Sequence, residues 1–237
     1  MAGQLCACVA AYRGKSVRSE DQGRWNLRLA GPGEVRPDTL ALLELFQDVL
    51  VMAPPKGMSA VLALDFYKEP LDGLPADQWP YTGAGQLVYD GKYASRSDPE
   101  AMRHPGQMLV GAMLTVVERH PAYTAATVVV GVPGHDQLRV SFGQRVADSL
   151  AQAAARQGVQ ARAKREFRTA AKALPQERRM AALRNEFTVD VDLRNRTVLV
   201  VDDVIHTGAT LTEMTRAARA AGASKVLGLV AARTLRR

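Results

Sequence analysis

The stretch Val198-Leu-Val-Val-Asp-Asp-Val-Ile-His-Thr-Gly-Ala-Thr210 decides the fold of this chain. It begins with four consecutive aliphatic residues, a pattern typical of a strand that is buried on both faces of a parallel sheet. Two carboxylates, Asp202 and Asp203, follow at the carboxyl end of this run. Residues 207–210 then predict a tight turn into a helix, whose apolar residues recur at helical spacing as far as residue 221. The stretch therefore predicts a strand, an acidic pair and a helix amino terminus, in that order.

This order of features predicts an anion-binding loop beside the acidic pair, Asp202 and Asp203. Backbone N–H groups at a helix amino terminus and the positive end of the helix dipole favour a phosphate, and the hydroxyls of Thr207 and Thr210 would converge on it. Carboxylates cannot help to bind a phosphate, so they must face polyol hydroxyls or a hydrated Mg²⁺. A ribose 5-phosphate carries both a phosphate and a vicinal diol. The alternative is an ordinary turn between strand and helix that happens to be acidic.

Composition indicates a globular protein. The chain has 237 residues, of which 47% are hydrophobic and 23% charged, and no run is long enough to span a membrane. Its first eight residues carry no charge before the apolar residues, so we expect no signal peptide and a cytoplasmic location. Cys6 and Cys8, without a second Cys or His pair nearby, make a poor zinc site.

Charge is unevenly distributed along the sequence. Residues 1–121 contain 12 basic and 14 acidic side chains, a net charge of −2, whereas residues 122–237 contain 19 and 10, a net charge of +9. The basic excess therefore lies in the half that carries the motif. It suits a polyanionic small ligand, and it would also suit nucleic acid.

The remaining elements predict an α/β fold. Residues 127–132 have the pattern of a second buried strand, which ends in Pro133-Gly134-His135, and a helix over 142–156 and a strand over 159–167 follow. This order predicts a twisted parallel sheet with right-handed crossovers and helices on both faces, in which the loops at the carboxyl ends of the strands share one crevice. We expect residues 81–237 to form this domain, and residues 1–80 to form a small N-terminal α+β appendage of unknown role.

The stretch 198–210 resembles the phosphoribosyl pyrophosphate (PRPP) motif of the type I phosphoribosyltransferases at every position except His206, where the family more often has Thr. From about residue 86 the order of features is similar to the ComF-like phosphoribosyltransferases, also known as predicted amidophosphoribosyltransferases. That family commonly begins with a four-cysteine zinc ribbon, which this sequence lacks. The further segments that carry the resemblance are Lys92-Tyr93, Val132-Pro133-Gly134-His135, Phe142 with Gln144, and Gln176-Glu177-Arg178-Arg179 with Phe187 downstream.

The resemblance implies a type I phosphoribosyltransferase core with the following site. Asp202 and Asp203 would be the catalytic pair and bind the ribose 2- and 3-hydroxyls. Mg²⁺ would be held mainly by pyrophosphate and ribose oxygens, without a dedicated protein cage, and Asp202 and Asp203 would reach it only through water. The loop that holds the 5-phosphate would consist of His206, Thr207, Gly208, Ala209 and Thr210. The residues that face pyrophosphate would be Val132, Pro133, Gly134, His135, Lys172, Arg178 and Arg179.

The basic run and His206 each have two alternative interpretations. The basic run between residues 168 and 186 is either a solvated face or a hood that closes over pyrophosphate. His206 either donates to the phosphate through its ring or fills a loop position through its backbone N–H.

The implied function is transfer of the 5-phosphoribosyl group from PRPP to a nitrogen acceptor, with release of pyrophosphate, which is a pentosyltransferase reaction. Two rival hypotheses keep the fold without this reaction. One is a non-catalytic regulator that senses PRPP, and the other is a ComF-like protein of competence or DNA uptake that binds single-stranded DNA. A homodimer is compatible with the amphipathic helix at residues 106–119 and with the appendage.

Overall fold

The computed structural model describes residues 13–18, 25–30, 37–94, 99–136, 140–165 and 181–235. Strands β1 (Arg13–Arg18) and β2 (Trp25–Ala30) pair with each other in an antiparallel ladder. None of the described helices is long and apolar enough to cross a membrane.

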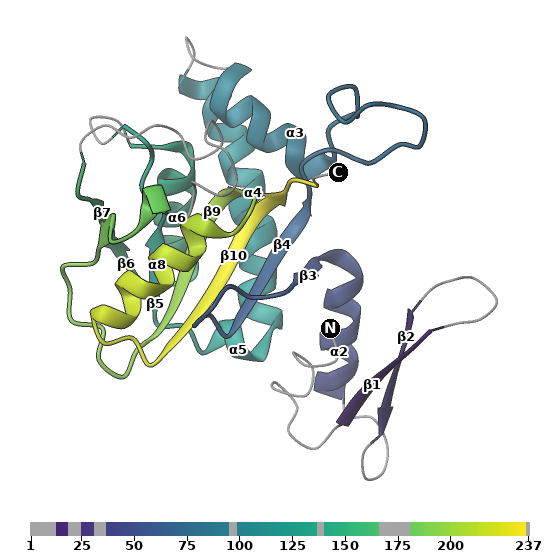
Figure 1. Ribbon diagram of the computed structural model, residues 1–237, viewed down its shortest axis with the longest axis horizontal. Coiled ribbons are helices and arrows are strands. Elements are labelled where there is room, and N and C mark those ends of the chain that lie inside the picture. The colour runs from purple at the N-terminus through teal and green to yellow at the C-terminus, as the bar shows by residue number, and fades with distance from the viewer. Residues whose placement is uncertain are drawn as a thin grey trace.

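A six-stranded sheet forms the centre of the molecule (Figure 1). Its order is β3 (Leu50–Met52), β4 (Ala60–Phe66), β10 (Lys225–Arg233), β9 (Thr197–Ile205), β5 (Val128–Gly131) and β6 (Gln157–Gln160). All neighbours run parallel except β3, which is antiparallel to β4. The prediction of an α/β fold with a largely parallel sheet is confirmed.

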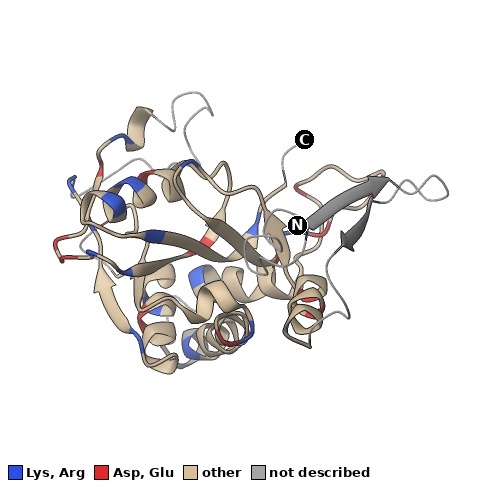
Figure 2. Cartoon of the chain, turned by 90° about the horizontal axis from the view of Figure 1, so that it is seen from below, with Lys and Arg blue, Asp and Glu red and all other residues tan. Residues whose placement is uncertain are grey.

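Helices cover both faces of this sheet (Figure 2). Side chains of β9 alternate between the faces, so Leu199 and Val201 join one core while Val198 and Val200 join the other. All four are buried, which explains why the sequence shows an unbroken aliphatic run here. The first core includes α2 (Pro37–Asp48), α4 (Pro99–Arg119), α5 (Pro121–Thr124) and α6 (Phe142–Ala153), and the second includes α8 (Ala209–Ala220).

Strand β4 belongs to this same sheet. Val61, Leu62 and Ala63 are fully buried, and Leu62 pairs with Leu229 of β10. An apolar strand that is covered on both faces needs partners on its backbone edges, and β10 and β3 supply them. Two strands that precede the predicted boundary at residue 80, β3 and β4, therefore lie in the same sheet as the strands that follow it.

The strand predicted over residues 159–167 is divided in two. Residues 157–160 form β6 within the sheet, whereas β7 (Arg162–Ala163) leaves it and pairs antiparallel with β8 (Phe187–Thr188). Ala161 and Ala163 are both buried, in the same core as α8, so alternation alone did not reveal the break.

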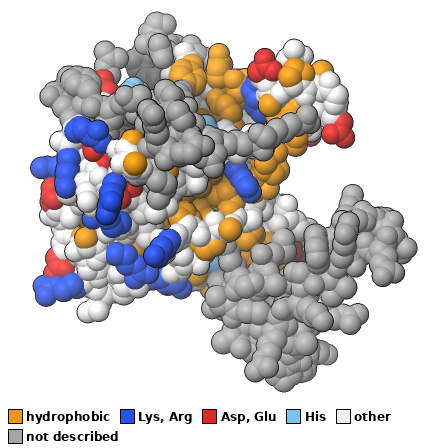
Figure 3. Space-filling view, in the orientation of Figure 1, with side chains coloured by type: hydrophobic (Ala, Val, Ile, Leu, Met, Phe, Trp, Pro, Cys, Tyr) orange, Lys and Arg blue, Asp and Glu red, His pale blue; other side chains and the backbone are white. Residues whose placement is uncertain are grey.

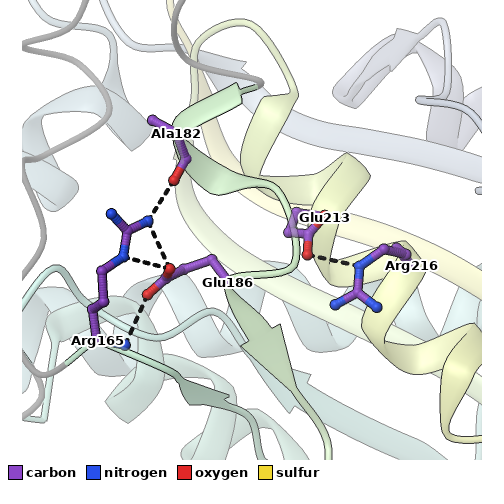
Figure 4. Close-up of polar contacts among 5 residues, drawn as sticks. All are labelled: Arg165, Ala182, Glu186, Glu213 and Arg216. Carbon is purple, nitrogen blue, oxygen red and sulfur yellow. Dashed lines mark hydrogen bonds and ion pairs between the residues drawn. The ribbon is translucent and has the colours of Figure 1, made fainter.

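An ion pair between the exposed Arg165 and the buried Glu186 lies next to this two-stranded ladder (Figure 4). The backbone N–H and Nε of Arg165 donate to the two carboxylate oxygens of Glu186, at 3.0 and 2.7 Å. The guanidinium of Arg165 also donates to the Ala182 carbonyl at 2.6 Å. Arg216 of α8 binds Glu213 and donates to the Phe187 carbonyl, so the ladder is fixed to the helix that follows the motif.

We expect His120 to make stability depend on pH. Its ring is fully buried, its Nδ1 accepts from the Ala122 N–H, and burial lowers its pKa from 6.5 to about 4. The folded protein thus keeps His120 neutral while the unfolded chain takes up a proton below pH 6.5. The free energy of unfolding should therefore fall by up to about 3 kcal/mol from this group as pH drops from 6.5 to 4.

Urea unfolding at several pH values would measure this effect. His120→Asn keeps an acceptor for the Ala122 N–H but cannot titrate, so its stability should change less steeply over the same range. Parallel pH profiles for the two proteins would contradict the assignment.

Candidate functional site

The acidic pair lies at the carboxyl edge of the sheet, beyond the end of a neighbouring strand. Strand β5 ends at Gly131, which pairs with Val201, whereas β9 continues to Ile205 beside β10. Asp202 and Asp203 are therefore within β9, not after it, because β10 supplies pairing that β5 no longer does. Both are partly buried, and Oδ1 of Asp202 accepts from the Asp203 N–H at 2.9 Å. Strand β5 is thus shorter than β9 at this edge. Ligands of α/β sheets bind at such carboxyl ends of strands.

Asp203 is paired with a lysine and lies close to the start of α6. Nζ of Lys92, in the π-helical turn η1 (Asp90–Ala94), lies 2.7 Å from Oδ1 of Asp203. A Cβ at Gly143 in the first turn of α6 would lie 3.1 Å from Oδ2 of Asp203, so only a glycine leaves room for the carboxylate there. Burial lowers the pKa of Lys92, but the charge and hydrogen bond of Asp203 and the charge of Asp202 outweigh it, so the pKa lies above its ordinary value. Lys92 is therefore a cation in the folded protein at neutral pH.

Sequence reasoning did not place Lys92 in the site. It entered only as one of the residues that carry the family resemblance, because its partner Asp203 lies 111 positions away. A contact across that separation leaves no local pattern in the sequence.

The loop predicted to bind phosphate leads directly into a helix. Gly208 is the N-cap of α8 and has φ of 78°, the left-handed region that favours glycine. It offers no side chain to cap the first turn, and its carbonyl accepts from the N–H and hydroxyl of Thr212. Thr207 is exposed and Thr210 partly buried, while Ala209 is buried. Backbone N–H groups at such a terminus are the donors that a phosphate requires.

His206 contacts the end of the neighbouring strand. Its Nδ1 lies 2.8 Å from the Thr234 hydroxyl, just beyond β10, and the Thr234 N–H donates to the Ile205 carbonyl. The ring is exposed, and this contact fixes its orientation at the edge of the phosphate loop.

The predicted pyrophosphate loop lies beside the acidic pair, at the end of β5. The Val132 N–H donates to the Val201 carbonyl at 3.0 Å, and Pro133 is buried while His135 is exposed. Oε1 of Gln144 accepts from the Ser141 N–H at 3.0 Å and from the Gly134 N–H at 3.5 Å. A capping box therefore fixes this loop to the amino terminus of α6.

The three basic residues predicted to face pyrophosphate, Lys172, Arg178 and Arg179, lie outside the described residues. Arg165 precedes that segment in the sequence and Ala182 follows it. Arg165 binds both the Ala182 carbonyl and the Glu186 carboxylate.

The carboxylates suit a hydrated Mg²⁺. Among the described residues, no group of three or more His, Cys, Asp or Glu side chains could hold a metal ion. Asp203 is paired with Lys92, and one oxygen of Asp202 accepts from a backbone N–H. Oxygen donors that are already engaged in this way fit contact through water better than a direct cage.

Residues 127–234 match the family model of the phosphoribosyl transferase domain. This match spans less than half of the 237 residues. The matched range contains the acidic pair, the phosphate loop and the loop after β5, whereas Lys92 and β4 precede it. No curated protein matches the chain.

Solved structures similar to this chain include phosphoribosyltransferases. A purine phosphoribosyltransferase from Pyrococcus horikoshii is 14% identical, with 55% of this chain and 82% of that chain covered and a TM-score of 0.37. Adenine phosphoribosyltransferase from Rhodothermus marinus is 21% identical, with coverages of 80% and 84% and a TM-score of 0.36. The enzyme of the same name from Leishmania tarentolae is 12% identical, with coverages of 77% and 94% and a TM-score of 0.40. At these scores the similarity carries no information on the acceptor.

Removing the cation beside Asp203 should destabilise the protein. Lys92→Met keeps most of the apolar stem but leaves a partly buried carboxylate unpaired, so we expect a loss of about 1–3 kcal/mol in the free energy of unfolding. Arg119→Met is the matched control, because it breaks exposed pairs with Glu44 and Asp48 and should cost at most about 1 kcal/mol.

Urea denaturation of both variants, and of Lys92→Met combined with Asp203→Asn, would test this. The second substitution should restore part of the loss, because it removes the unpaired charge. Equal losses for Lys92→Met and Arg119→Met would contradict the role of this pair.

Proposed function

We propose that this protein binds PRPP at the carboxyl edge of its sheet and transfers the 5-phosphoribosyl group to a nitrogen acceptor, with release of pyrophosphate. The observation that carries the proposal is one continuous segment within the phosphoribosyltransferase domain. In it, the acidic pair on β9 is followed after four residues by the glycine-capped start of α8. A ligand that carries both a vicinal diol and a phosphate, such as a ribose 5-phosphate, matches these two groups.

The reaction breaks the bond between ribose C1 and a pyrophosphate oxygen and forms a bond between C1 and the acceptor nitrogen. Positive charge develops on the ribose as the leaving group departs, so the protein's task is placement and electrostatic stabilisation. Asp202 and Asp203 would accept hydrogen bonds from the ribose hydroxyls. Lys92 would keep Asp203 ionised and fixed in orientation. The first turn of α8 would anchor the 5-phosphate.

The loop from Val132 to His135 would bind the leaving pyrophosphate. Its attachment to α6 through Gln144 supports this role, because a loop that is already ordered costs less to organise on binding. Mg²⁺, when bound, supplies positive charge to the pyrophosphate oxygens. Lys172, Arg178 and Arg179 would add further charge on that side.

We also propose that the protein belongs to the ComF-like branch of the phosphoribosyltransferases. Lys92 supports it, because a residue that carries that resemblance contacts the acidic pair. A nitrogen acceptor, a cytoplasmic location and a homodimer stay predictions from the sequence alone.

Calorimetric titration with PRPP tests the function. We expect magnesium-dependent binding to the wild type and a loss of affinity of at least about 100-fold in the double variant Asp202→Asn, Asp203→Asn, because two acceptors of ribose hydroxyls lose their charge. Asp190→Asn, Asp192→Asn is the matched control, since it neutralises two exposed carboxylates outside the site.

The rival functions give different results. Pyrophosphate release with an added nitrogen acceptor indicates the enzyme, and binding without release indicates a sensor. Absence of PRPP binding, together with single-stranded DNA binding that falls steeply with salt, would reject the proposal.

A second test concerns His206. Because its ring contacts Thr234 beside β10, we expect the ring not to bind the phosphate, so the affinity should depend on pH in the same way with and without the imidazole. Ribose 5-phosphate itself titrates near pH 6, so its affinity should be followed in both wild type and His206→Gln. Coincident pH profiles are expected. A steeper fall with rising pH in the wild type alone would show that the imidazolium contacts the phosphate.

A further inference from the structure

Helices α4 and α6 pack side by side on the same core, and the surface between them is hollowed. The cavity measures about 590 Å³, which is within the range of pockets that bind small molecules. Each helix lines it with residues at positions i, i+3, i+4 and i+7, starting from Arg103 in α4 and from Phe142 in α6. Residues at this spacing share one face of a helix, so the cavity is a groove with two helical walls. We call it the α4–α6 groove.

Small residues in both walls keep the groove open. Gly106 of α4 has no side chain, and a Cβ there would lie 3.8 Å from Cε2 of Phe142, which is ordinary contact. Ser149 of α6 is small and exposed. The apolar lining consists of Phe142 and Val146, which are buried, and Val110, which is half-buried. An apolar ring would therefore meet a surface that is already formed.

Two arginines, Arg103 and Arg145, lie toward the same end of the groove. Both helices run from the carboxyl edge of the parallel sheet to its amino edge, because α4 precedes β5 and α6 follows it. Each arginine is within the first five residues of its helix, where the helix dipole is positive. None of the described residues that line the groove is acidic. This end therefore favours an anion, and guanidinium groups bind carboxylate and phosphate through paired donors.

Positive charge alone does not distinguish the groove from the rest of the surface. Lys and Arg side chains also gather on the α8 side of the molecule (Figure 3), which is the other face of the sheet. On that side Arg216 binds Glu213, and Arg219 donates to the Ala223 carbonyl. The groove differs because its arginines border a hollow with an apolar lining. This combination fits a ligand that is both anionic and apolar.

The groove is separate from the acidic pair, although Phe142 lies between the two. Phe142 packs on η1, which follows α3 (Gly83–Tyr89), and a Cβ at Gly91 would lie 2.2 Å from Cζ of its ring. The next residue, Lys92, pairs with Asp203, and neither of these two lines the groove. A ligand in the groove would thus contact Phe142 without contacting Asp203.

We propose that the α4–α6 groove is a second binding site, and that its ligand is a small aromatic ring that carries a carboxylate or phosphate group. The ring would lie against Phe142 and Val146, and the acidic group would bind Arg103 and Arg145. The inference goes beyond the proposed function and does not depend on it, because the ligand would not occupy the PRPP site.

Fluorescence titration with anilinonaphthalene sulfonate (ANS), an aromatic anion, tests the site. Phenylnaphthylamine has the same rings without the charge and is the neutral probe. Arg103→Gln with Arg145→Gln removes both cations, and Ser149→Leu fills the groove from the α6 wall. Arg184→Gln with Arg196→Gln is the matched control, since it removes two exposed cations that do not line the groove. Circular dichroism of each variant checks that it is folded, as expected for substitutions of exposed side chains.

We expect ANS to bind the wild type and the double variant of Arg103 and Arg145 to lose at least about tenfold in ANS affinity, because two charge-assisted contacts are removed. Its affinity for phenylnaphthylamine should stay within about twofold of the wild type, since the apolar lining is intact. Ser149→Leu should weaken both probes at least about fivefold, because it occupies their space. The matched control should bind both probes as the wild type does.

Displacement of ANS from the wild type identifies the acidic group. Benzoate and phenyl phosphate carry the same ring with a carboxylate or a phosphate, and benzamide is their neutral counterpart. We expect at least one of the two acids, and not benzamide at equal concentration, to displace ANS.

Four results would overturn the inference. They are absence of ANS binding to the wild type, unchanged ANS affinity in the double variant of Arg103 and Arg145, unchanged affinity in Ser149→Leu, and displacement by benzamide as readily as by the acids. Displacement of ANS by PRPP with Mg²⁺ would also reject a second site, because it would place the probe at the acidic pair. Calorimetry with PRPP is a separate measurement, so failure of the groove leaves the proposed function intact.

Discussion

The ion pair between Lys92 and Asp203 connects three parts of the molecule that the sequence keeps far apart. It joins the π-helical turn after α3 to the central strand β9, at the point where the first turn of α6 also touches the carboxylate. Because both partners are partly buried, either one alone would leave a charge in a poorly solvated place. The pair therefore fixes η1 against β9.

Close backbone contacts complete this arrangement. Glycine at 85 lets α3 meet the end of β4, glycine at 131 lets α6 approach β5, and glycine at 143 leaves room for the Asp203 carboxylate. At Gly85 and Gly143 an added Cβ would meet backbone or carboxylate atoms at 3.1 Å or less, and at Gly131 it would lie 2.9 Å from Cβ of Ala147. The carboxyl edge of the sheet is thus formed by helices that begin close to strand ends, which is the arrangement that presents helix amino termini and loops to one ligand.

The edge has a chemical order along the sheet. The loop at the end of β5 lies on one side of the acidic pair, and the start of α8 follows the pair along the chain. Under the proposed function these two positions suit an ionic leaving group and a sugar phosphate, respectively. His206 and Thr234, which contact each other, directly follow the neighbouring strands β9 and β10.

The sequence by itself determined the elements whose pattern is local. The run from Val198 to Val201, the acidic pair and Gly208 predicted a buried strand, paired carboxylates and a helix start, because burial on both faces and left-handed backbone each demand particular residue types. The helix after Pro133-Gly134-His135 was also predicted from apolar spacing. Only the tertiary structure decided the partners across long separations: β4 beside β10, Lys92 on Asp203, and α4 beside α6. Such contacts depend on how the strands are ordered in the sheet, and strand order is set by packing of the whole chain instead of by any local period.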